Sequence, residues 1–109
     1  MMMKSDLRWD LNENDGVIEV SLAGDLDSTN ALDFLKQLRN YMQNSINRLV
    51  FLVEGLEYIS SEGIKALFYA GEEAQGDSKI VLDSENNFIA DLIRETGLDD
   101  LFIIEQRTN

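Results

Sequence analysis

The chain has 109 residues, of which 44% are hydrophobic, and this length suits a single domain with a core of its own. Its 21 acidic residues outnumber its 9 basic ones, and the resulting net charge of −12 argues against direct binding to nucleic acids or anionic membrane surfaces. It contains no His and no Cys, which excludes a Ser-His-Asp triad, a Cys-His pair and a His- or Cys-bound zinc within the chain.

The sequence has no apolar stretch as long as a signal peptide core or a membrane span. Together with the absence of cysteine, this predicts a cytoplasmic protein, and the net charge favours a monomer. A Gly-rich phosphate-binding loop is also absent, and we expect no cofactor. No linker or repeat divides the chain, so one domain is predicted over 1–109, with flexible ends at 1–5 and 106–109.

Two short stretches near the N-terminus alternate apolar and polar residues, as half-buried strands do. Their apolar positions are Leu7, Trp9 and Leu11 in the first stretch and Ile18, Val20 and Leu22 in the second. Asp15-Gly16 lies between them and favours a tight reversal, so the two stretches are predicted to form an antiparallel hairpin. Trp9 occupies an inward position, which indicates a packing role.

The next apolar residues recur at helical spacing, at Ala31, Leu35, Leu38 and Met42. Asp27 or Ser28 precedes this predicted helix, and either side chain is a suitable N-terminal cap.

Five consecutive apolar residues, Leu49–Val53, predict a central strand from about Arg48 to Val53 that is buried on both faces. A short turn is expected to follow, and then a helix over Ser61–Ala74. Ser60 or Ser61 is the candidate cap of this helix. A hydroxyl at such a position lies beside unpaired backbone N–H groups and the positive end of the helix dipole, which suits an added phosphate.

The C-terminal third predicts a strand at Lys79–Leu82, a helix and a last strand at Leu101–Ile104. Ser84 is the candidate cap of this helix, and the apolar stripe of the helix is Phe88, Ile89, Leu92 and Ile93. Gly97 is expected to end the helix in a left-handed conformation, with Leu98 covering the helix end. The order is β-β-α-β-α-β-α-β. Because single helices join the later strands, we predict an α/β fold with a mixed, mostly parallel sheet, an N-terminal antiparallel hairpin and helices packed on the sheet.

Three stretches of the chain resemble the STAS domain family, and most closely the bacterial anti-sigma factor antagonists. They are Leu22–Asp27, Gly55–Ile64 and Thr96–Phe102. The resemblance implies a binding module in a partner-switching pathway, and not an enzyme. In that family the unphosphorylated antagonist binds a partner that is both an anti-sigma factor and a serine kinase; this partner phosphorylates it, and a PP2C-type phosphatase resets it.

Matched position by position, the resemblance places the phosphorylated serine at Ser61, with Ser60 as the alternative acceptor. The implied partner-binding surface comprises Asp25, Asp27, Ser60, Ser61, Glu62, Gly63 and Ile64. Three residues depart from the family pattern: Ser60 stands where Asp is usual, Glu62 stands where Ser or Ala is usual, and Leu52 stands where an Asp is common late in the central strand. Glu62 therefore adds a permanent negative charge beside the acceptor.

Two other functions remain open on the sequence. The departures at Ser60 and Glu62 fit a STAS adaptor that is not switched, as a subunit of a lipid-transport or stress-signalling complex. The second is an enzyme that uses carboxylates and Mg²⁺, with Asp25 and Asp27 as its candidates. No strand end carries the clustered Asp and following Lys that a phosphoacceptor receiver domain needs, which argues against this second function.

Overall fold

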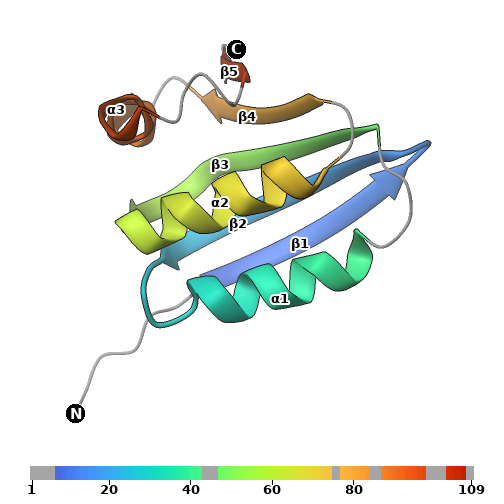
Figure 1. Cartoon of the computed structure of the whole chain (residues 1–109). Coiled ribbons are helices and arrows are strands. Elements are labelled where there is room, and N and C mark those ends of the chain that lie inside the picture. The colour runs from blue at the N-terminus through green and yellow to red at the C-terminus, as the bar shows by residue number, and fades with distance from the viewer. Residues whose placement is uncertain (1–6, 43–46, 75–76, 84–86, 98–102, 108–109) are drawn as a thin grey trace.

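The protein is described here from a computed structural model that covers residues 7–42, 47–74, 77–83, 87–97 and 103–107. Five strands form one sheet in the order β1-β2-β3-β4-β5 (Figure 1). The elements are β1 Leu7–Asn14, β2 Val17–Leu26, α1 Ala31–Tyr41, β3 Arg48–Ile59, α2 Ser61–Glu73, β4 Asp77–Asp83, α3 Asn87–Thr96 and β5 Ile103–Arg107. The predicted element order and the α/β class are confirmed.

The N-terminal hairpin forms as the sequence predicts. β1 and β2 pair antiparallel, and the two residues between them, Asp15 and Gly16, both have positive φ, at 54° and 81°. Positive φ at both positions is the type I′ geometry, whose twist matches that of the flanking strands. Trp9 points inward and meets the ring of Phe34 edge-on at 5.0 Å between centroids, so its predicted packing role is confirmed.

All remaining strand pairs are parallel, and each is joined through a helix. Right-handed crossovers that advance in one direction along a sheet place their helices on the same face. Figure 1 shows α1 and α2 lying side by side across this face. The buried residues between sheet and helices form a single cluster, to which all three helices contribute; among its members are Ile18, Phe51, Phe34, Leu67, Ile89 and Ile93.

The central strand is longer than the sequence indicates. The prediction that β3 ends near Val53 is wrong, because the chain stays extended to Ile59. Its second half pairs with the end of β2 after a shift in register, joining Ala23 to Gly55 and Leu26 to Ile59. Gly55 looks like a turn residue, yet it serves a close approach between strands: a Cβ there would lie 2.9 Å from the carbonyl oxygen of Leu22.

Asn30 occupies the N-cap position of α1 without a capping hydrogen bond from its side chain, and the prediction of Asp27 or Ser28 at this position is wrong. The carboxylate of Asp27 instead accepts hydrogen bonds from the backbone N–H and the hydroxyl of Thr29, at 2.9 and 2.6 Å. The Asn30 side chain accepts from the N–H of Asp27 and donates to the carbonyl of Asp25, each at 3.0 Å. These bonds fold residues 25–30 into a tight turn that delays the start of the helix. The helix then ends at Tyr41.

In α3 the apolar stripe is narrower than predicted. Ile89 and Ile93 are fully buried, whereas Phe88 is 41% exposed, because the buried face is centred on Ile89, Ala90 and Ile93 and Phe88 falls at its edge. Gly97 has a φ of +78°, which confirms the predicted left-handed end. The predicted cap Ser84 and the covering residue Leu98 lie outside the described residues.

The last two strands differ from prediction at their ends. β4 runs over Asp77–Asp83 and is longer than the predicted Lys79–Leu82. β5 continues to Arg107, beyond the predicted end at Ile104, because residues 105–107 pair with residues 81–83 of β4. Gln106 and Arg107 therefore belong to the sheet, although the sequence favoured a loose end there. Residues 1–5, 101–102 and 108–109 lie outside the described part of the chain.

Candidate functional site

The serines between β3 and α2 occupy different positions. Ser60 is the cap of α2, and its Oγ accepts a hydrogen bond from the backbone N–H of Gly63 at 3.1 Å. Its own N–H donates to the carbonyl oxygen of Leu26 at the end of β2, at 2.9 Å. Ser60 therefore both starts the helix and ties it to the neighbouring strand.

Ser61 is the first residue of α2 and is exposed. Its hydroxyl points towards Glu62, with 3.4 Å between Oγ and Oε1, which is a long contact for a hydrogen bond. The capping bond is made by Ser60, so the Ser61 hydroxyl is not needed to hold the helix. It lies at the positive end of the helix dipole, where an anion is favoured.

Glu62 carries a stable negative charge beside this hydroxyl. Hydrogen bonds from its own backbone N–H and from the Ser60 hydroxyl lower the pKa of Glu62, and the Ser61 hydroxyl and Lys65 act in the same direction. Its side chain is exposed. Because the folded-state pKa is lowered, any stability that this carboxylate contributes is present above about pH 4.5 and is lost as the pH falls further.

Gly63 and Ile64, which the sequence places in the site, lie beneath it. Ile64 is 4% exposed and belongs to the core. Gly63 is packed so closely that a Cβ would lie 2.6 Å from the carbonyl oxygen of Leu26. These two residues hold the start of α2 against β2, and both are buried beneath the exposed surface.

Asp25 lies near the end of β2 and Asp27 directly follows this strand, next to the end of β3 that leads into Ser60. Strand pairing sets Asp25 opposite Tyr58, and Leu26 opposite Ile59. Both aspartates are partly exposed. The fold therefore brings together two of the stretches that resemble the STAS family. We call the surface formed by Asp25, Asp27, Ser60, Ser61 and Glu62 the serine corner.

Among the described residues, no group of three or more acidic side chains is gathered closely enough to hold a metal ion. In the same part of the chain, no helix is both long and apolar enough to cross a membrane.

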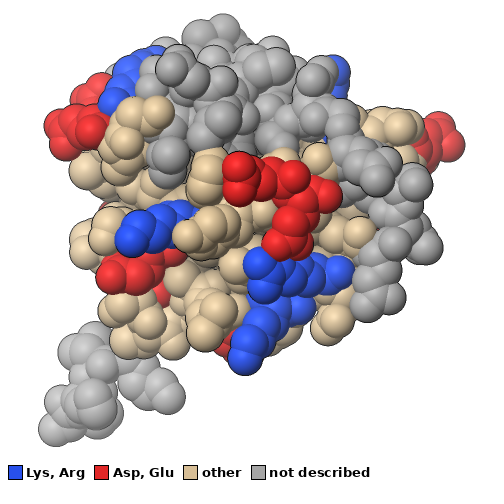
Figure 2. Space-filling view, viewed as in Figure 1, with Lys and Arg blue, Asp and Glu red and all other residues tan. Residues whose placement is uncertain are grey.

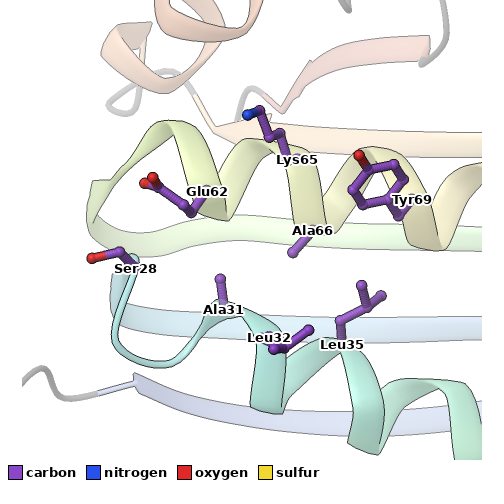
Figure 3. Close-up of a pocket in the computed structure, with 8 residues that line it drawn as sticks. All are labelled: Ser28, Ala31, Leu32, Leu35, Glu62, Lys65, Ala66 and Tyr69. Carbon is purple, nitrogen blue, oxygen red and sulfur yellow. The ribbon is translucent and has the colours of Figure 1, made fainter.

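A groove between α1 and α2 adjoins the serine corner, and it was not predicted from the sequence. Its volume is about 200 Å³, and it is lined by Ser28, Ala31, Leu32, Leu35, Glu62, Lys65, Ala66 and Tyr69 (Figure 3). Ala31, Leu35 and Ala66 point into the space between the helices, and Ser28 and Glu62 lie at one end. The residues that could have indicated the groove are Leu32 and Tyr69, two large apolar residues outside the buried stripes of their helices. Their exposed fractions are 62% and 46%.

Replacing Ser60 with alanine is expected to lower the free energy of unfolding by about 1 kcal/mol, because the N–H of Gly63 loses its capping partner. Ser61→Ala is the matched control: it removes the same hydroxyl one residue later and should change stability by less than about 0.5 kcal/mol. Urea denaturation followed by circular dichroism measures both. Equal losses in the two variants would contradict the assignment of the cap.

The fold and the corner define an α/β domain with helices on one face of a mostly parallel sheet and an exposed hydroxyl at the start of its second helix. The family model of the STAS domain matches residues 8–109, and the chain belongs to this family.

Three solved structures share the fold. A crystal structure of an anti-sigma factor antagonist from Mycobacterium paratuberculosis matches with a TM-score of 0.80 and 23% identity, covering 96% of this chain and 90% of that one. The anti-sigma factor antagonist SpoIIAA in its unphosphorylated form matches with a TM-score of 0.73 and 15% identity, over 94% and 90% of the two chains. The Bacillus cell fate determinant SpoIIAA in its phosphorylated form gives 0.65 and 14%, over 94% and 93%.

Proposed function

We propose that this protein is an anti-sigma factor antagonist, a binding module without enzymatic activity. In this proposal the serine corner binds an anti-sigma factor that is also a serine kinase, and phosphorylation of Ser61 ends the binding. A PP2C-type phosphatase restores the unmodified form. The observation that supports the proposal most is that the two serines differ in role: Ser60 caps the helix, while the Ser61 hydroxyl is exposed and has no capping role.

The proteins whose structures are similar support the proposal, because their described roles and states agree with it. Two of them are anti-sigma factor antagonists, and SpoIIAA has been seen both with and without phosphate. A STAS domain with this fold can therefore exist in two phosphorylation states.

The position of Ser61 gives a phosphate opposite effects on folding and on binding. A phosphate adds about −1.5 to −2 charge. At the start of α2 the helix dipole favours this charge by roughly 0.3–1 kcal/mol, so the domain should stay folded. When a partner covers the corner, an unpaired buried charge costs several kcal/mol, and each ~1.4 kcal/mol lowers the affinity tenfold. Such an asymmetry lets one modification end binding without unfolding the protein.

Incubation with purified kinase-type anti-sigma factors of the same organism and ATP should place one phosphate on Ser61, which mass spectrometry of the digested protein would locate. Ser61→Ala should bind the same partner and not be modified, whereas Ser60→Ala should still be modified at Ser61. Ser61→Asp should bind at least about tenfold more weakly than Ser61→Ala, because it buries a charge at the corner.

Two results would overturn this function. Modification of Ser60 in the wild-type protein would move the switch to the capping residue. Stable binding that ignores ATP, and that Ser61→Asp does not weaken, would instead indicate an adaptor without a switch, such as a STAS subunit of a lipid-transport or stress-signalling complex.

A further inference from the structure

The groove between α1 and α2 combines an apolar floor with a charged end. Ala31 and Ala66 are 3% and 4% exposed, and because both side chains are small the space between the helices stays open. Leu32 and Tyr69 stand at its rims and remain largely in contact with solvent. Single exposed apolar residues are common on protein surfaces, but here two of them flank the same hollow.

An exposed ion pair joins the two helices outside the groove. Arg39 of α1 donates from Nε to both carboxylate oxygens of Glu73 of α2, at 3.0 and 2.9 Å, and its Nη2 lies 2.6 Å from Glu73 Oε2. Guanidinium–carboxylate pairs of this kind fix orientation as well as distance. The groove is open in the structure of the chain without a partner, and a site formed in advance lowers the entropy cost of filling it.

The size of the groove selects its occupant. Its volume of about 200 Å³ is below the roughly 300–1,000 Å³ of sites for small molecules, and it suits one large side chain. A bulky apolar anchor inserted into a pocket is the usual centre of a protein interface. Glu62 closes the end of the groove nearest to Ser61 (Figure 3).

Charge adds a second requirement for the partner. Glu62 is ionised at neutral pH, as an exposed carboxylate is, and hydrogen bonds and Lys65, which also lines the groove, lower its pKa; the protein as a whole carries −12. Figure 2 shows that on this face acidic and basic side chains lie next to each other in a few patches, with uncharged surface between the patches. A cation that reaches the Glu62 end would therefore meet a local partner and a favourable overall field.

We infer that this groove binds one bulky apolar side chain of a partner protein, next to a Lys or Arg of that partner that pairs with Glu62. The inference rests on the proposed function for the identity of the partner, and it adds the surface that anchors it. Because Glu62 directly follows Ser61, a partner that pairs with Glu62 lies close to the Ser61 hydroxyl.

Selection of short random peptides displayed on phage against the purified protein tests the groove without any kinase. Enriched peptides should share a Leu, Phe, Met or Trp close to a Lys or Arg. Fluorescence anisotropy with a labelled peptide then measures affinity. Leu32→Asp should weaken binding at least about tenfold, since it places a charge at the rim of the groove. Glu62→Gln should weaken it about threefold and reduce its dependence on salt.

Phe88→Asp is the matched control, because it makes the same change at another exposed apolar residue on a helix, outside the groove. It should leave the affinity within about twofold of the wild type. Both variants change exposed side chains, and circular dichroism would verify that they fold. The inference is overturned if no apolar–basic pattern is enriched, or if Leu32→Asp binds the selected peptides as well as the control does.

The two proposals fail separately in this design. Peptide binding at the groove without any kinase that modifies Ser61 would remove the switch and keep the docking surface. Modification of Ser61 by a kinase whose affinity Leu32→Asp leaves unchanged would keep the switch and remove the docking surface.

Discussion

Replacing Phe34 with alanine is expected to lower the free energy of unfolding by about 3–5 kcal/mol, the range for removing a buried aromatic side chain. Phe34 is 2% exposed and joins α1 to the sheet, where its ring meets the edge of Trp9. Its removal leaves a cavity between the first helix and the hairpin. Since whole domains are stable by only about 5–15 kcal/mol, this loss should be visible as a large shift of the urea midpoint.

Leu32→Ala is the control for Phe34→Ala, because it shortens another large apolar side chain two residues earlier in the same helix. Leu32 is 62% exposed, so its truncation should cost less than about 0.5 kcal/mol. Similar losses in the two variants would show that α1 packs on the sheet through a different face from the one described.

Replacing Gly63 with alanine should destabilise the protein by about 1–3 kcal/mol, although helix propensity alone would favour alanine there by about 1 kcal/mol. The added Cβ would lie 2.6 Å from the carbonyl oxygen of Leu26 and 2.8 Å from Cγ1 of Ile59. A backbone carbonyl at the end of a paired strand cannot move aside as a flexible side chain can. The start of α2 would therefore have to shift away from β2 and carry Ser60 and Ser61 with it.

Gly97→Ala separates this steric effect from a conformational one. Gly97 has a positive φ of 78° and nothing within 4 Å of an added Cβ, so alanine there should cost only about 1 kcal/mol, through backbone strain. Thermal unfolding of both variants measures the difference. A Gly63→Ala variant more stable than the wild type would contradict the close contact between α2 and β2.

Local patterns in the sequence predicted most of the architecture. The alternation around Trp9 and Val20, the Asp15-Gly16 reversal and the apolar run at Leu49–Val53 each depend on neighbouring residues only, and the structure has the elements that they indicate. The parallel pairing followed from the helices between the strands, because such a connection requires a crossover. The family also followed from short motifs, since the STAS domain model matches 8–109.

The start of α2 was predicted in its position but not in its details. The sequence marked both serines at the start of α2, yet it left open which of them caps the helix. The structure assigns the cap to Ser60, because its Oγ faces the N–H of Gly63. The sequence also counted Ile64 among the surface residues. Its burial depends on how α2 is rotated against the sheet, and helical spacing alone does not fix that rotation.

The features that the sequence did not predict depend on contacts between segments that are far apart in the chain. β3 continues to Ile59 because its second half pairs with the end of β2, and the register of that pairing is set about 30 residues away. The groove exists because two alanines on different helices face each other across it. Contiguous residues determine periodicity, turns and caps through local sterics and hydrogen bonds. Register, burial and the spaces between elements are settled only when the whole chain packs, since each depends on atoms that the neighbouring sequence does not contain.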